Sequence, residues 1–166
     1  MEKSLDSYVN EYRKQLEIGD IRKAYKGIIE YILKFKNHLI HTYPDFFISD
    51  NLYQGCMDIS YFTFTPESLK NKGLKIAIIF NHEKIRFEVW LVGRNKQVQE
   101  KYWKLFRKNK EEIFYIIPPT AQYSVAEKLL VENPEFEKPD QLTEQIENGI
   151  MEFINNILYP LSHLVS

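Results

Sequence analysis

Three residues capable of binding chemistry alternate along one short stretch of the chain: Arg86, Glu88 and Trp90. Successive side chains of a β-strand point to opposite faces, so this spacing would put all three on one face of a sheet. The arginine offers a planar fork for a carboxylate or phosphate, and the tryptophan a broad surface for an aromatic or cationic ligand. Lys75 and Asp58 join them if their strands lie in matching register. We therefore expect a binding site for a small polar ligand.

Two other interpretations of the same residues stand beside this one. Antiparallel sheets commonly leave one face in water, where Arg86 and Glu88 would only pair and Trp90 would cover a lysine stem. A metal-dependent nuclease or phosphodiesterase could instead use Asp58 and Glu88 as metal ligands. Against that alternative, Trp90 stands two residues after Glu88, where such enzymes usually carry a lysine.

The histidines and the cysteine suggest weaker candidates. His38 and His41 are three residues apart, a spacing that allows a shared metal, but Asp45 is the only nearby third ligand. These imidazoles could equally interact with the exposed carbonyls of a helix C-terminus. His82 could act as a general base, but it has no visible acid partner and we expect it in solvent. Cys56 has no nucleophile signature, and we expect it to be buried.

The stretch Leu74 to Val92 must position the first candidate site, and its pattern predicts a β-hairpin. With a turn centred between His82 and Glu83, one face pairs only apolar residues: Leu74 with Leu91, Ile76 with Val89, Ile78 with Phe87, and Phe80 with Ile85. The other face is mixed. A loop one residue longer or shorter would set charged side chains opposite the apolar row, so the pattern fixes the parity of the loop.

Helices are predicted at both ends of the chain. Apolar residues from Leu5 to Leu16 fall on one helical face, and Gly19 followed by Asp20 predicts a tight turn into a second helix over 21–41. Gly27 within that helix hints at a close backbone contact. A C-terminal helix is expected from residue 142 to Pro160.

Shorter elements are predicted between these helices. A strand is expected from residue 57, after an aromatic loop over 44–55, and Thr65 with Pro66 indicates the start of a short helix. Another helix follows Asn95, and strands are predicted over 114–117 and 125–131, although the segment 125–131 could also form a helix. This order predicts one α+β domain over residues 1–166: a mostly antiparallel sheet of about five strands, with an N-terminal helical hairpin and a C-terminal helix packed on it.

Composition restricts the possible functions. The chain carries 22 basic and 23 acidic side chains, so it has no general attraction for nucleic acid or an anionic membrane. One cysteine excludes an internal disulfide and any multi-cysteine zinc site, which fits a reducing compartment. The longest apolar run, Ile76 to Phe80, is far too short to cross a membrane, and the N-terminus lacks a signal-peptide pattern. We expect a soluble cytoplasmic protein without a nucleic-acid or membrane partner.

Several phrases of the sequence resemble a family of bacterial proteins known only as a domain of unknown function. The phrases are Tyr53-Gln54-Gly55 with Met57-Asp58, Asn81-His82-Glu83-Lys84 with Arg86-Phe87-Glu88 and Trp90-Leu91, Tyr102-Trp103, and Val131-Glu132-Asn133-Pro134 with Phe136. The resemblance extends over nearly the whole chain. It implies a stand-alone bacterial domain and carries over no activity, cofactor or site residue.

The chain shows no glycine-rich phosphate loop, serine elbow or HExxH motif, so no cofactor is expected. Because no catalytic machinery is assembled, we expect a non-enzymatic module that binds a small polar ligand or a protein. The metal-dependent nuclease using Asp58 and Glu88 is the alternative.

Overall fold

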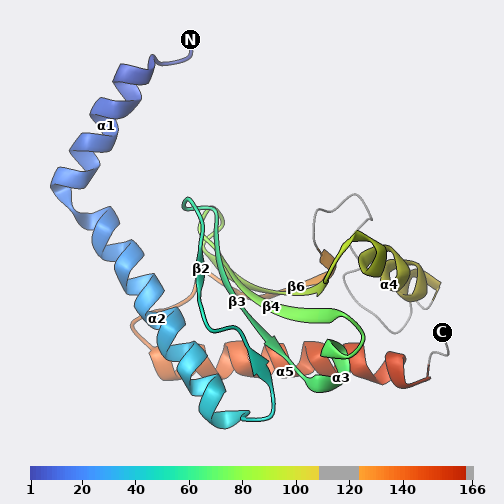
Figure 1. The fold of residues 1–166 in the computed structure, drawn as a ribbon. Helices are drawn as coiled ribbons and strands as arrows, with labels where there is room; N and C mark the ends of the chain where they lie inside the picture. The colour runs from blue at the N-terminus through green and yellow to red at the C-terminus, as the bar shows by residue number, and fades with distance from the viewer. Residues whose placement is uncertain (109–123, 164–166) are drawn as a thin grey trace.

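The fold is α+β, built on a six-stranded antiparallel sheet with helices at both ends of the chain (Figure 1). The computed structural model describes residues 1–108 and 124–163. The strands are β1 (Phe47–Ile48), β2 (Tyr53–Gln54), β3 (Ile59–Thr65), β4 (Leu74–Asn81), β5 (Arg86–Gly93) and β6 (Ser124–Glu132). They run in the order β1-β3-β4-β5-β6, and β2 also pairs with β3.

Five helices accompany the sheet within the described residues: α1 (Leu5–Ile18), α2 (Asp20–Thr42), α3 (Glu67–Lys70), α4 (Lys96–Lys108) and α5 (Pro139–His163). Figure 1 shows α2 and α5 side by side along one face of the sheet, with α4 at one end of the opposite side. No helix in the described part of the chain has an apolar stretch long enough to span a bilayer.

The predicted hairpin forms, but its register is shifted by two residues. Ile76 pairs with Leu91, Ile78 with Val89 and Phe80 with Phe87. A shift of two leaves every side chain on its predicted face, because the strand period is two. The parity prediction is therefore confirmed, and the individual pairs were wrong.

The turn explains the shift. A two-residue turn needs residues such as Asn-Gly that accept positive φ, and His82-Glu83 offers neither. The strands instead end at Asn81 and Arg86, with four residues between them. Ile85 takes φ 48°, and its carbonyl accepts a hydrogen bond from the Asn133 backbone N–H. The longer loop moves the register by two residues without exchanging the faces.

The apolar face of the hairpin forms the centre of the core. Buried side chains from β3, β4 and β5 meet α2 and α5, and the largest fully buried ones are Phe35, Phe62, Phe64, Phe80, Phe87 and Phe106. Tyr31 contributes edge-on ring contacts with Phe87 and Phe136, at centroid distances of 5.9 and 5.5 Å. The aromatic content of the chain is thus used mainly for packing the sheet against two helices.

The N-terminal helices meet at Gly19 as predicted, with Gly19 in the left-handed region at φ 84°. They do not fold back on each other as a hairpin: Figure 1 shows α1 extending away from the body beyond the start of α2, and no residue of α1 is buried. A turn at Gly19 fixes where α1 ends, but the angle between the helices depends on apolar contacts that α1 does not make.

Other boundaries differ slightly from the sequence-based expectations. The aromatic loop contains the short strands β1 and β2, and Pro66 rather than Thr65 caps α3. The C-terminal helix does not end at Pro160 but continues through it to His163, with Pro160 buried in the last turn. The predicted strand over 114–117 lies outside the described residues.

Two glycines provide a matched test of the packing. A Cβ at Gly93 would lie 2.7 Å from the backbone nitrogen of Gln99 in the first turn of α4, whereas one at Gly27 would meet nothing within 4 Å, contrary to the predicted close contact. We expect Gly93→Ala to lower the free energy of unfolding by about 1–3 kcal/mol. Gly27→Ala should raise it by roughly 0.5–1 kcal/mol through helix propensity. Urea unfolding measures both, and a harmless Gly93→Ala would contradict the close approach of α4 to β5.

Candidate functional site

The face of the sheet opposite α2 and α5 carries the candidate site. Cross-strand pairing defines one row across five strands, consisting of Tyr53, Tyr61, Ile79, Glu88 and Leu129. Trp90 stands in the next row opposite Ala77, and Arg86 stands on the other side of the row, opposite Asn81. The predicted trio therefore lies on one face, at consecutive same-face positions of β5.

Glu88 joins the other two members of the trio. Its side chain is only 5% exposed, and it receives a short charge-assisted hydrogen bond from Arg86 Nε on one oxygen. Trp90 Nε1 donates to the other oxygen at 3.0 Å. Both oxygens of this buried carboxylate are thus satisfied by its two neighbours, which explains how a charge is accommodated beside the buried Ile79 and Ala77.

This arrangement fixes the orientation of Arg86. The guanidinium is held through Nε, and its side chain remains 26% exposed. Within the described residues, neither terminal nitrogen of Arg86 has a hydrogen-bond partner. A guanidinium anchored at Nε presents its outer edge to solvent with little rotamer freedom left to lose, which is a suitable arrangement for receiving an anion.

The structure places Lys75 beside Trp90 but far from Arg86, and it leaves Asp58 away from the trio. Lys75 shares the face and pairs with Val92, one same-face position beyond Trp90, so it is a diagonal neighbour of Trp90 and lies roughly 20 Å from the level of Arg86. Asp58 precedes β3 in an exposed bend, where its backbone oxygen accepts a hydrogen bond from His82 N at 2.8 Å. The trio is therefore local to β5.

The nuclease geometry does not assemble either. By register, Glu88 lies two strands from β3 and level with Tyr61, three residues beyond Asp58, which gives a separation of roughly 14 Å. One metal ion needs ligand oxygens within about 2–2.6 Å of it. Across residues 1–108 and 124–163, no group of three His, Cys, Asp or Glu side chains could hold a metal ion.

His82 is not free in solvent at the hairpin tip, contrary to expectation. Its Nε2 lies 2.8 Å from Ser60 Oγ, and its ring stacks on Tyr25 with centroids 5.4 Å apart. Burial lowers the pKa of His82, while the nearby Asp58 charge acts in the opposite direction. Because Ser60 is only 1% exposed, this serine is a buried partner for the imidazole and not an accessible nucleophile.

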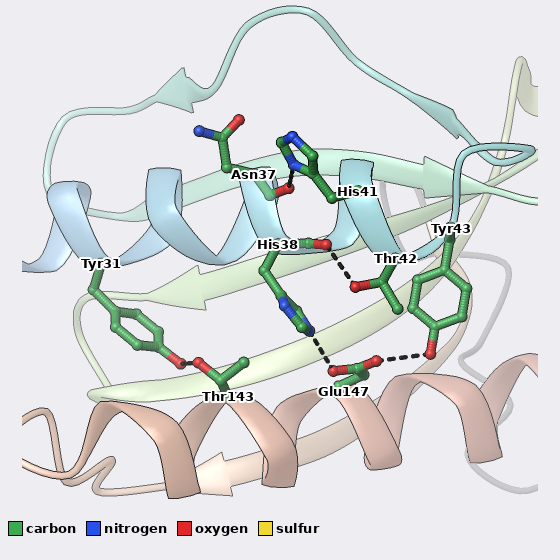
Figure 2. A network of polar contacts seen from close by, with 8 residues as sticks. All are labelled: Tyr31, Asn37, His38, His41, Thr42, Tyr43, Thr143 and Glu147. Carbon is green, nitrogen blue, oxygen red and sulfur yellow. Dashed lines mark hydrogen bonds and ion pairs between the residues drawn. The ribbon is translucent and has the colours of Figure 1, made fainter.

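The other histidine pair does not form a metal site. Figure 2 shows His38 and His41 pointing in different directions from α2. His38 Nε2 lies 2.6 Å from Glu147 Oε2 on α5, whereas His41 Nδ1 lies 2.8 Å from the Asn37 carbonyl oxygen. His41 thus interacts with a carbonyl near the helix C-terminus, which is the simpler of the two interpretations of this pair.

The contacts of His38 belong to a polar seam between α2 and α5. Tyr43 donates a hydrogen bond to the second oxygen of Glu147 at 2.8 Å, and the Tyr31 hydroxyl lies 3.0 Å from Thr143 Oγ1 (Figure 2). Burial raises the pKa of Tyr31 to about 12. Burial, followed by the hydrogen bond and the charge of Glu147, raises the pKa of Tyr43 to about 12. These contacts fix how the helices dock.

A hollow of about 210 Å³ lies between the end of β6 and the start of α5, lined mainly by Glu132, Asn133, Glu135, Lys138, Gln141 and Gln145. It is smaller than most ligand sites, and its lysine is already paired with Glu135. The exposed edge of Arg86 remains the better candidate.

Comparison with protein families gives one match. Residues 5–161, nearly the whole chain, match the model of a domain of unknown function, DUF7000. The chain belongs to the DUF7000 family. The comparisons found no matching protein among curated proteins and no matching solved structure. The resemblance inferred from the sequence is confirmed, and the membership assigns no role to any residue of this DUF7000 domain.

Sequence reasoning missed the long-range partners in this DUF7000 domain. Ser60 and Tyr25 lie 22 and 57 residues from His82, and Glu147 lies 109 residues from His38. No local sequence pattern predicts such contacts. The available signal was Phe62 and Phe64, which share the parity of Ser60 and lie with it on the buried face of β3; reading Ile59 and Tyr61 as the apolar side instead puts Ser60 on the polar side, and that interpretation was wrong. Cys56 is exposed rather than buried, because it lies in the bend before β3.

Glu88→Gln tests the central carboxylate. The substitution keeps the shape but leaves the Arg86 charge without its counterion, so we expect the free energy of unfolding to fall by about 2 kcal/mol. The control is Glu135→Gln, which breaks the ion pair of Glu135 with Lys138. Because the Glu135 side chain is 67% exposed, this substitution should lower the free energy of unfolding by less than about 0.5 kcal/mol. Chemical denaturation of both variants measures the difference. Equal stabilities would show that Glu88 is not an organising contact.

The raised pKa of Tyr31 predicts that folding stability declines at alkaline pH. Its raised pKa means that the unfolded phenol ionises from about pH 10 while the folded phenol stays neutral to about pH 12, so stability is complete below pH 10 and is lost above it. Tyr31→Phe should cost about 1 kcal/mol at neutral pH and flatten this decline. Thr143→Val removes the same hydrogen bond but should retain the decline. Denaturation at several pH values separates the two variants; matching curves would rule out Tyr31 as the titrating group.

Proposed function

We propose that this DUF7000 domain is a non-enzymatic binding module that takes a small anionic ligand at the partly exposed Arg86, on the sheet face opposite α2 and α5. The anion, a carboxylate or a phosphate, binds the outer edge of Arg86, and an apolar or planar part of the ligand lies over Trp90. The observation that carries the proposal is the buried Glu88 carboxylate, which holds both side chains in place and leaves the guanidinium edge open.

The chemistry of the trio favours an anion over other ligands. Both carboxylate oxygens of Glu88 already accept hydrogen bonds from Arg86 and Trp90, and the residue is only 4% exposed. Glu88 is therefore a poor ligand for a cation. Among the residues that the structure describes, the terminal nitrogens of Arg86 have no partner, and their fork geometry matches two oxygens of one anionic group. A preorganised donor loses less entropy on binding than a freely rotating side chain, which improves affinity without additional contact area.

Aromatic side chains extend the surface beyond Arg86. Tyr53 and Tyr61 pack together with centroids 4.9 Å apart, and Tyr53 is 51% exposed on the same face. Leu129, in the same row, is 42% exposed. An anionic ligand with an apolar portion therefore meets a guanidinium and an aromatic surface on one side of the sheet, and its apolar portion provides the burial that an anion alone lacks.

We also place this module in a reducing compartment, the bacterial cytoplasm. Cys56 is a free, exposed thiol, and such thiols oxidise readily in secreted proteins. The near-neutral net charge supports the same assignment by giving no reason to expect a membrane or nucleic-acid partner.

Benzoate tests the binding proposal, with inorganic phosphate as the second probe. In a Trp103→Phe background Trp90 is the sole tryptophan, so we expect its fluorescence to change on titration and the melting midpoint to rise. Benzamidine has a similar ring with a cationic group and should produce neither effect. Arg86→Gln should abolish the response, and Lys34→Gln, at an exposed position of α2 on the opposite face of the sheet, should preserve it.

The outcome is decisive at millimolar concentration. Titration to about 10 mM detects dissociation constants in the millimolar region. If neither benzoate nor phosphate changes the fluorescence or the melting midpoint at that concentration, the proposed site is wrong. A response that survives Arg86→Gln would place binding elsewhere on the protein and also contradict it.

A further inference from the structure

The helix α1 carries an apolar stripe that the rest of the described protein leaves open. The stripe consists of Leu5, Tyr8, Val9, Tyr12 and Leu16, which fall within about 100° of the helix circumference. The exposed fractions of the first four are 76%, 52%, 43% and 66%. No residue of α1 is buried, and Figure 1 shows the helix projecting from the body as an arm.

An arm of this kind needs a covering surface. The helix has 14 residues, and isolated helices of about 12–15 residues are marginal in water even when their sequences favour helix. Ser4 caps its first turn and Gly19 ends it, but capping contributes only about 1 kcal/mol. The exposed leucine and two tyrosines are the side chains that usually stabilise such a helix by burial against a partner.

The charges beside the stripe suggest which partner this is. Leu5, Val9, Tyr12 and Leu16 alternate at spacings of four, three and four, the seam of a two-helix coiled coil. One flank of that seam carries Asp6 near the helix start and Arg13 seven residues later. When two identical helices pack antiparallel, like flanks face each other, so Asp6 of each copy meets Arg13 of the other. A parallel pair would instead set this flank against Tyr8 and Gln15.

We propose that α1 is a homodimerisation arm that pairs antiparallel with α1 of a second copy of this chain. The flank is self-complementary under two-fold rotation, as an isologous interface requires. Two such stripes offer on the order of 1,000 Å² of contact, the lower limit for a specific interface, so the dimer dissociates in the micromolar range. This interface is separate from the sheet face proposed to bind an anion.

The charge of α1 argues against a membrane surface as the occupant. The helix carries three carboxylates, Asp6, Glu11 and Glu17, against two cations, Arg13 and Lys14. Helices that lie on anionic membranes carry an excess of lysine and arginine on their polar side. Antiparallel pairing sets carboxylates against cations across the interface. An anionic lipid surface would instead repel the three carboxylates and attract only the two cations.

Sedimentation velocity on the full chain, from about 1 µM to about 500 µM, tests the proposal over the expected range of dissociation. We expect wild type to pass from monomer to dimer within that range. Val9→Glu puts a charge in the centre of the seam and should raise the dissociation constant roughly tenfold or more. Asn10→Glu adds the same charge one residue away, off the seam, and should leave it within about twofold.

Charge reversal tests the antiparallel arrangement. Asp6→Arg and Arg13→Asp should each weaken dimerisation, because each sets like charges together across the two-fold axis. The double variant restores opposite charges and should recover most of the wild-type affinity. Since α1 contributes nothing to the core, all variants should keep the wild-type melting midpoint when measured as monomers, which excludes misfolding as the cause.

A wild-type chain that remains monomeric at about 500 µM would overturn the proposal. So would a dimer that Val9→Glu leaves unchanged, because its interface would then lie elsewhere. Failure of the double charge reversal to recover affinity would exclude the antiparallel arrangement.

Discussion

The period of two along β4 and β5 is the constraint on which the rest of the structure depends. On the core face of the hairpin, the buried apolar residues of the two strands stand opposite each other, from Ile76 and Leu91 to Phe80 and Phe87. The helices α2 and α5 cover this face, so the alternate side chains must lie on the other one. Arg86, Glu88 and Trp90 are together because the core requires their neighbours Phe87, Val89 and Leu91.

The same constraint explains what sequence reasoning could and could not predict. Faces follow from parity, and a shift of two residues leaves parity unchanged, so the membership of each face of the β4–β5 hairpin was predictable from the alternation alone. The register was not, because it depends on the loop, and the loop relies on Ile85 in an unfavourable conformation held by Asn133, 48 residues further along the chain. Asp58 was included only on a matching register of its strand, and it lies apart from the trio, whereas Lys75 remains a neighbour of Trp90 after the shift.

Contacts between distant segments were the other limit. The trio is local, with members two residues apart, and each hydrogen bond within it can be inferred from one strand. The partners of His82 and His38 come from other elements, where no spacing rule applies. Likewise, the stripe on α1 predicts a helix but not what covers it. The sequence predicted a helical hairpin, but α2 packs its buried side chains, including Tyr31 and Phe35, against the sheet and α5.

The desolvation cost of the buried Glu88 charge makes it a poor source of stability, and we propose that this charge has another role. Replacing a buried ion pair with apolar residues of similar volume is often neutral or stabilising, because desolvating the charges costs several kcal/mol. Ile79, opposite Glu88, is fully buried, so an apolar side chain at position 88 would extend an existing apolar surface. A methionine at position 88 would pack against Ile79, but it would no longer hold Arg86 in its fixed orientation. Under the proposed function, the carboxylate is the group that positions the guanidinium for an anion.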